Sequence, residues 1–262
     1  MKPYRGFLLD LDGTIYRGNE PIPEAIRFME QLRMRNIPYL YLTNNSSTSP
    51  EKVAQRLCGM GIPTKTEEVY TTSMAIGAYL TEHVPHGARI FAIGEEGLFQ
   101  ELQQAGYTIT NDRPDCVVVG IDRAFSYEKL AVATKAIREG ALFLATNQDA
   151  ALPTEHGLVP GNGSLVAAVA VASGSSPIVV GKPESIIVDY ALRRLGLGKS
   201  DTLIVGDNLQ TDILAGHHSG VDSLLVLTGF STAEDAAQTV HKPTYIADNL
   251  LTWWEEYSAL LD

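Results

Sequence analysis

Residues 9–15 read LDLDGTI and follow directly on the apolar residues Phe7 and Leu8. Two carboxylates, Asp10 and Asp12, therefore stand at the end of an expected buried strand. There they repel each other, and burial makes each one costlier to ionise. Gly13 lets the chain turn away tightly after the pair. This arrangement indicates that a cation belongs beside the two side chains.

The bulk composition restricts the class of protein. The chain has 262 residues, of which 45% are hydrophobic, enough for one large domain or two smaller ones. Lys and Arg number 20 against 31 Asp and Glu, which gives a net charge of −11. That charge argues against nucleic acid or an anionic membrane surface as the main partner. A local cation can still attract a small anionic substrate.

Cysteine use and hydropathy predict a cytoplasmic protein. The two cysteines, Cys58 and Cys116, lie far apart and form no CxxC pair, as suits a reducing compartment. The first residues, MKPYRGFLLDLDG, reach charged residues too early for a signal peptide. The longest run of small apolar residues, LVAAVAVA at 165–172, is far below the ~20 residues of a membrane span.

Short apolar runs alternate with helical patterns over nearly the whole chain. GFLL precedes an amphipathic stretch at 23–35, and PYLYL precedes a helix expected at 49–61. IVV and TLIV precede helices expected at 184–195 and 209–218, and SLLVL follows. Repeated strand–helix units predict an α/β fold with a Rossmann-like, mostly parallel sheet covered by helices on both faces.

A stretch of about 100 residues, 72–177, has the size of a small domain of its own. RIFAI, CVVVGI and ALFLA are expected strands, and SYEKLAVATKAIREG is an expected helix capped by Ser126. The sequence thus predicts an inserted, smaller α/β cap. The expected bounds are a core of 1–78 and 177–262 and a cap of 79–176.

Polar residues follow each strand that we assign to the core. Ligands of open parallel sheets bind just beyond the carboxyl ends of the strands. Acids stand at two of these ends, and Asp10, Asp12 and Asp207 are expected to form a cation pocket. Mg²⁺ prefers oxygen ligands, commonly one or two carboxylates together with water and a substrate phosphate. The sequence therefore predicts a magnesium site.

Hydroxyl, amide and ammonium groups follow the other expected core strands. Thr43 and Asn44 come after YLYL, and Lys182 comes after IVVG, which predicts an anion pocket beside the cation pocket. With both pockets present, one aspartate can attack an anionic phosphorus, while the other protonates the leaving oxygen and then activates water. The expected chemistry is phosphoryl transfer.

Four short motifs resemble those of a known family and stand in the same order. They are DLDGT at 10–14, LTNN at 42–45, GKP at 181–183 and GDNLQTD at 206–212. They resemble the motifs of the haloacid-dehalogenase (HAD) superfamily of aspartate-nucleophile phosphatases. The insertion resembles the larger, C2-type α/β cap of the NagD-like branch, as ATNQD at 145–149 and VPGNGSLVAAV at 159–169 do.

The resemblance implies a role for each matching residue. Asp10 would be the nucleophile that forms an aspartyl-phosphate, and Asp12 the general acid and base whose main-chain carbonyl also binds Mg²⁺. Asp207 would be a further metal ligand.

The resemblance also implies which residues bind phosphate. Thr43 and Asn44 would hold phosphate oxygens, and Lys182 would neutralise charge and orient Asp10. Further substrate contacts or supporting residues would be Asn45, Ser46, Asn208 and Asp212.

The expected function is Mg²⁺-dependent hydrolysis of the phosphomonoesters of small metabolites, first of all sugar or sugar-acid phosphates. Nucleoside monophosphates, phosphoglycolate and pyridoxal phosphate stay open, as does transfer by a phosphomutase. A dehalogenase is disfavoured, because those enzymes lack the second acid, present here as Asp12. The alternative from another class is a signalling module that accepts phosphate on Asp10 without turnover, although receiver domains lack that acid and the cap.

The cap is expected to select the substrate. We expect specificity from residues 147–155 and from the GLVPGNG loop at 157–163, where no basic or aromatic cluster demands a nucleotide. The cap would move on linkers near 73–81 and 174–177. Its exposed surfaces would support a homodimer.

Overall fold

The computed structural model describes residues 2–154 and 157–260, which form two compact units. We call them the core unit (Met1–Thr43, Val53–Tyr70 and Lys182–Asp262) and the cap unit (Asn44–Lys52 and Thr71–Gly181). The sequence predicts a core of 1–78 and 177–262 and a cap of 79–176. These domain bounds stay a prediction.

The core unit is built on a sheet with the strand order β15-β14-β13-β1-β4-β5. Its strands are β1 (Gly6–Leu9), β4 (Tyr39–Thr43), β5 (Val69–Thr71), β13 (Thr202–Gly206), β14 (Asp222–Val226) and β15 (Tyr245–Ala247). Both neighbours of β1, β13 and β4, run parallel to it. The four residues of GFLL are all buried, as a central strand covered on both faces requires. The predicted α/β class with a parallel core sheet is confirmed.

The remaining elements of this unit are helices and one hairpin. They are α1 (Pro23–Met34), α2 (Pro50–Gly59), α7 (Ser185–Leu195), α8 (Leu214–Ser219), α9 (Ala233–Gln238), α10 (Leu250–Ser258), the 3₁₀ turns η1 (Thr66–Glu68) and η2 (Lys199–Asp201), the π-helical turn η3 (Leu209–Ile213), and strands β2 (Tyr16–Arg17) and β3 (Glu20–Pro21). The first three residues of α2 are counted with the cap unit. Across the described ranges, no helix combines the length and the apolar character needed to cross a bilayer.

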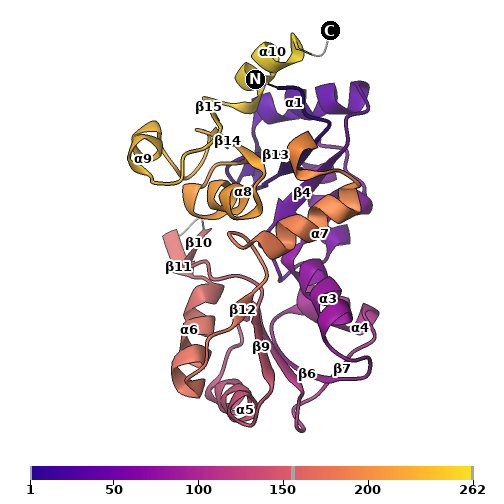
Figure 1. Cartoon of the computed structure of the whole chain (residues 1–262), viewed down its shortest axis with the longest axis vertical. Coiled ribbons are helices and arrows are strands. Elements are labelled where there is room, and N and C mark those ends of the chain that lie inside the picture. Colours follow the sequence, from indigo (N-terminus) through magenta and orange to yellow (C-terminus); the bar gives the residue numbers. More distant parts are fainter. Residues whose placement is uncertain (1, 155–156, 261–262) are drawn as a thin grey trace. The chain divides into compact units, whose positions relative to one another are not determined.

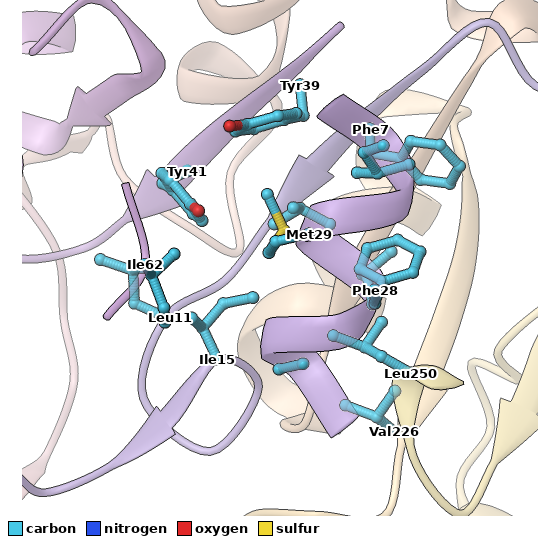
Figure 2. Close-up of a cluster of buried hydrophobic side chains, with 14 of the residues drawn as sticks. Phe7, Leu11, Ile15, Phe28, Met29, Tyr39, Tyr41, Ile62, Val226 and Leu250 are labelled. Carbon is cyan, nitrogen blue, oxygen red and sulfur yellow. The ribbon is translucent and has the colours of Figure 1, made fainter. Parts of the chain in front are cut away.

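Helices α1 and α10 lie side by side (Figure 1) and bury one face of the core sheet. Phe7 of β1 meets Phe28 of α1 edge-on, with 5.7 Å between ring centroids, and Trp253 of α10 at 5.9 Å. Figure 2 shows this cluster, in which Met29 points from α1 toward the same interior. Successive residues of a strand point to opposite faces of the sheet. Because all four residues of GFLL are apolar, β1 can be buried on both faces, which fixes it in the middle of the sheet.

The cap unit has its own parallel sheet, with the strand order β12-β9-β8-β6-β7. Its strands are β6 (Arg89–Ile93), β7 (Thr108–Ile109), β8 (Cys116–Val119), β9 (Leu142–Ala145) and β12 (Ile178–Val179). Its other elements are α3 (Thr72–His83), α4 (Glu96–Gln104), α5 (Tyr127–Arg138), α6 (Asn162–Ser173) and the hairpin of β10 (Ala151–Thr154) and β11 (Gly157–Pro160). Ser126 caps α5 as predicted, because its hydroxyl accepts from the amide of Lys129.

One strand lies in a different sheet from the one expected. The IVV run forms β12, which pairs with β9 of the cap sheet and is absent from the core sheet. The amides of Val180 and Gly181 continue this pairing toward Ala145 and Thr146. The run is apolar enough to be a strand, but its composition does not reveal which sheet edge it joins.

The expected linkers are also corrected. Residues 73–81 form most of α3, and both 73–81 and 174–177 lie inside the cap unit. The hydroxyl of Thr71 caps this helix by accepting from the amide of Met74, and Ile76 and Leu80 are buried. A stable, capped and buried helix is not a flexible connection.

Candidate active site

Three carboxylates of the core unit gather beyond the ends of β1 and β13. Among the described residues, Asp10, Asp207 and Asp212 each offer one oxygen within 4.8 Å of the others. Asp10 follows β1, Asp207 follows the neighbouring strand β13, and Asp212 lies in η3. Gly206 has no room for a Cβ atom beside Asp212, so the close approach of η3 to β13 depends on this glycine.

Lys182 joins this cluster from the start of the last core segment and is only 2% exposed. Its Nζ donates to Asp10 Oδ1 at 2.5 Å, to Asp212 Oδ1 at 2.7 Å and to the carbonyl oxygen of Leu42 at 3.0 Å. The ammonium therefore bridges the expected nucleophile and a second carboxylate, and it reaches the strand that ends at Thr43.

The environment shifts the pKa of each charged group in the cluster. Burial, with repulsion from Asp212 and Asp207, raises the pKa of Asp10 well above its ordinary value, although the charge of Lys182 opposes this shift. Burial by itself lowers the pKa of Lys182, but the carboxylates of Asp10 and Asp212 more than offset it, so the pKa is raised. Burial and repulsion from Asp212 raise the pKa of Asp207 to about 7.

The donor set fits a divalent cation. With three carboxylates around one ammonium, the ionised cluster has two negative charges in excess, and buried charges without partners are costly. The carboxylate oxygens of Asp10 and Asp207 are ligands that Mg²⁺ prefers. Asp212 serves differently, because its Oδ1 accepts from Lys182 and its Oδ2 from the amide of Asn208 at 3.1 Å. It supports the lysine.

Asp12 lies outside this cluster, at the base of the β2–β3 hairpin. Its side chain is exposed, and Oδ1 accepts from the amide of Gly18 at 3.4 Å. A backbone bridge joins Asp12 to Tyr16. The side chain of Asp12 therefore lies apart from the three clustered carboxylates.

The residues of the second motif are divided between the two units. Thr43 ends β4 and is buried in the core unit, whereas Asn44 belongs to the cap unit. Within the cap unit, Asn44 Nδ2 donates to Asp149 Oδ2 at 3.1 Å, and the carbonyl oxygen of Asn44 accepts from Asn147 Nδ2 at 2.8 Å and from the hydroxyl of Thr72 at 3.0 Å. The backbone after Thr43 is therefore firmly held.

The next two residues shape the loop. Asn45 Oδ1 accepts from both the amide and the hydroxyl of Ser47, at 2.8 and 2.9 Å. Ser46 is buried, its hydroxyl 3.4 Å from that of Thr146 and its carbonyl accepting from Ser73. These contacts give both residues a structural task, and a contact with the substrate stays a prediction. Asn208 caps η3 by accepting from the amide of Gln210.

Part of the region expected to set substrate specificity makes hydrogen bonds that stabilise the cap unit itself. Asn147 and Asn162 are buried, and Asn162 Nδ2 donates to the carbonyl oxygens of Asn147 and Val119 at 2.8 and 3.2 Å. The GLVPGNG stretch forms β11 and the start of α6, with Leu158 exposed. Residue 155, the last of the stretch 147–155, lies outside the described residues.

Sequence reasoning missed a segment that follows β14. The amide of Phe230 donates to Asp207 Oδ2 at 2.6 Å, and the amide of Ser231 donates to the carbonyl oxygen of Asp207 at 3.0 Å. The rule that ligands bind beyond strand ends applies to SLLVL as much as to the other core strands, and it would have found these residues. Asp149 lies within the stretch 147–155 expected from the sequence, but its contact with Asn44 is identified only by the fold.

Two family models match the chain. One, described as haloacid dehalogenase-like hydrolase, matches residues 7–108, and one described as HAD-hydrolase-like matches residues 179–253. A protein of Bacillus subtilis (strain 168) named 5'-nucleotidase YutF is 49% identical over 253 residues, covering 97% of this chain and 98% of that protein. A protein of Staphylococcus aureus (strain USA300) named acid sugar phosphatase is 46% identical over 246 residues, covering 94% and 95%.

Similarity to a solved structure identifies the branch. NagD from Escherichia coli K-12 superimposes with a TM-score of 0.89 at 33% sequence identity, covering 96% of this chain and 98% of that one. The four motifs, the carboxylate cluster around Lys182 and the inserted parallel sheet agree with this similarity. The chain belongs to the haloacid dehalogenase-like hydrolases and is a phosphatase of their NagD-like branch.

Proposed function

We propose that the chain is a Mg²⁺-dependent phosphomonoester hydrolase that carries the phosphoryl group on Asp10 during turnover. The observation that supports this most directly is the ammonium of Lys182, buried 2.5 Å from Asp10 Oδ1 and 2.7 Å from Asp212 Oδ1. Its positive charge favours the ionised form of Asp10, in a site where burial and the neighbouring carboxylates oppose ionisation.

We assign the metal ligands to the carboxylates of Asp10 and Asp207 and to the main-chain carbonyl of Asp12. A bound magnesium ion would supply positive charge that neutralises these ligands and the substrate phosphate. Thr43, Asn44 and Lys182 are assigned to the phosphate oxygens.

In the first step, a carboxylate oxygen of Asp10 attacks phosphorus, and the bond from phosphorus to the leaving oxygen breaks. The carboxyl group of Asp12 donates its proton to that oxygen, so an alcohol leaves and the phosphoryl group stays on Asp10. The charge of Lys182 favours the ionised nucleophile that this step needs.

In the second step, the ionised Asp12 takes a proton from a water molecule whose oxygen attacks phosphorus. The bond from phosphorus to the Asp10 oxygen breaks, and inorganic phosphate leaves. Asp10 is restored as a carboxylate and Asp12 as an acid. The exposed position of Asp12, outside the cluster, supports this double role.

The proposed substrates are the phosphomonoesters of small metabolites, selected by an inserted domain of residues 79–176 in a catalytic core of 1–78 and 177–262. Sugar and sugar-acid phosphates are favoured by the Staphylococcus aureus relative named acid sugar phosphatase. Nucleoside 5'-monophosphates are the second candidate, favoured by the Bacillus subtilis relative named 5'-nucleotidase.

The test is release of inorganic phosphate from hexose phosphates, sugar-acid phosphates, nucleoside 5'-monophosphates, phosphoglycolate and pyridoxal phosphate, with and without Mg²⁺. Asp10→Asn should abolish release, whereas Asp248→Asn, an exposed aspartate of the core unit, should leave it unchanged. The ranking of kcat/KM identifies the substrate class. A stable phosphoryl adduct on the wild type with no release would contradict hydrolysis and favour the signalling alternative.

A further inference from the structure

The segment Thr228–Ser231, between β14 and α9, holds Asp207 by two hydrogen bonds. The amide of Phe230 donates to Asp207 Oδ2 at 2.6 Å, and the amide of Ser231 donates to the main-chain carbonyl of Asp207 at 3.0 Å. Both donors are backbone groups, so their positions depend on the path of the segment and not on side-chain rotamers. With Oδ2 held, Asp207 can present Oδ1 to a cation in one orientation.

Gly229 allows these two hydrogen bonds because it has no side chain. A Cβ atom at Gly229 would collide with the carboxylate of Asp207, so any other residue there displaces the ligand or the segment. Gly229 is not among the glycines of positive φ, and its backbone is one that other residues adopt. The requirement for glycine is therefore the close approach to Asp207 alone.

The same segment is tied to the loop that follows Asp12. The hydroxyl of Thr228 is buried and donates to the carbonyl oxygen of Gly13 at 2.6 Å, and Arg17 Nε donates to the carbonyl oxygen of Thr228. On its other side, the hydroxyl of Ser231 accepts from the amide of Leu209 at 3.0 Å. Through these hydrogen bonds the segment connects the loop after β1 with the turn after β13.

We propose that Thr228–Ser231 is a positioning segment for the metal ligand Asp207, and that it sets the affinity of the site for Mg²⁺. The proposal rests on the proposed Mg²⁺ dependence and names the residues that tune it. None of the three side chains of the segment has to touch the substrate, because the segment acts through Asp207 and Gly13. Groups that orient a metal ligand typically change metal affinity by about 10- to 100-fold when they are altered.

The experiment measures Mg²⁺ binding to the full chain by isothermal titration calorimetry, beside phosphate release as a function of Mg²⁺ concentration. Gly229→Ala should weaken Mg²⁺ binding by at least about 10-fold, and saturating Mg²⁺ should restore most of kcat. The matched control is Gly59→Ala, which adds the same methyl group where the structure has open space and should leave Mg²⁺ affinity unchanged.

A second pair of variants keeps the test decisive if Gly229→Ala does not fold. Thr228→Val removes the hydroxyl with little change of shape and should weaken Mg²⁺ binding, whereas Thr228→Ser keeps the hydroxyl and should bind as the wild type does. Folded Gly229→Ala or Thr228→Val with wild-type affinity would overturn the proposal. Wild type that binds no Mg²⁺ and releases no phosphate would instead refute the proposed function on which it rests.

Discussion

The ammonium of Lys182 supplies positive charge to the carboxylate cluster. It is the shared partner of Asp10 and Asp212, and it also holds the carbonyl oxygen of Leu42 at the end of β4. Removing one member of a buried ion pair leaves the other charge uncompensated. At Asp10, the proposed nucleophile, the consequence is chemical as well as structural, because a protonated carboxyl group is a poor nucleophile.

Lys182→Met should therefore lower kcat/KM by at least about 10²-fold, the scale of a lost electrostatic contact in a buried site. The exposed Lys199, paired with Asp189, offers the matched control Lys199→Met, for which kcat/KM should stay near that of the wild type. Steady-state phosphate release from the best substrate measures both. Activity of Lys182→Met within a few-fold of the wild type would refute the assigned role.

Asp12→Asn should lower kcat by about 10²- to 10⁴-fold for alkyl phosphates, the range of a lost general acid and base. With p-nitrophenyl phosphate, whose leaving group departs without a proton, the first turnover should survive as a burst of p-nitrophenolate followed by slow release of phosphate. Stopped-flow absorbance separates the two phases. Asp10→Asn should show no burst, and a burst in that variant would place the nucleophile elsewhere.

Single elements are held by a few specific contacts as well as by hydrophobic burial. The hydroxyl of Tyr257 in α10 accepts from the amide of Tyr4 at 2.7 Å and donates to the carbonyl oxygen of Tyr4 at 2.9 Å. This pair joins the last described helix to the residues just before β1, and α10 in turn covers α1 (Figure 1). Helix α10 is thus joined to the residues that lead into β1, the strand that Asp10 follows.

Tyr257→Phe should lower the free energy of unfolding by about 1–3 kcal/mol, because a buried amide and carbonyl lose their partner. The control is Tyr127→Phe at an exposed position of α5, where a change within about 0.5 kcal/mol is expected. Urea denaturation measures both. Since the hydroxyl of Tyr257 bonds to the backbone of Tyr4, kcat should not change, and a lower kcat with unchanged stability would contradict a purely structural contact.

At the scale of the whole molecule, the buried carboxylates link stability to pH. Folding raises the pKa of Asp207 from its ordinary 3.8 to about 7, and the pKa of Asp10 is also raised. Between those two values the folded chain keeps a proton on Asp207 that the unfolded chain has released. Stability therefore falls as pH rises through this interval, since the folded state binds more protons.

Without divalent metal, the free energy of unfolding should thus decrease as pH rises from about 4 to about 7, and Asp207→Asn should flatten that decrease. Added Mg²⁺ should stabilise the wild type most toward pH 7 and above, because metal ligands must be ionised. Denaturation in urea at several pH values, with EDTA or with Mg²⁺, gives the four curves. A metal-free wild type that gains stability from this pH rise would contradict the assigned shifts.

By itself, the sequence determined the α/β class, the strands RIFAI, CVVVGI and ALFLA, and the order of the four motifs. These follow from periodicity and from residue types at strand ends, which are local properties of the chain. Asp10 and Asp207 could also be predicted to share a site, because neighbouring parallel strands present their carboxyl ends at one edge. Lys182 does join that site, but the strand expected to bring it there lies in the cap sheet.

Only the tertiary structure decided which sheet β12 joins, that 73–81 is the helix α3, and that Asp212 binds Lys182 through one oxygen. The tertiary structure also revealed that the backbone of Thr228–Ser231 donates hydrogen bonds to Asp207. Apart from the helix α3, each of these facts joins residues far apart in the chain, and short apolar runs and lone polar residues are compatible with many partners. Pairing is decided when all segments compete for the same edges and the same buried hydrogen bonds.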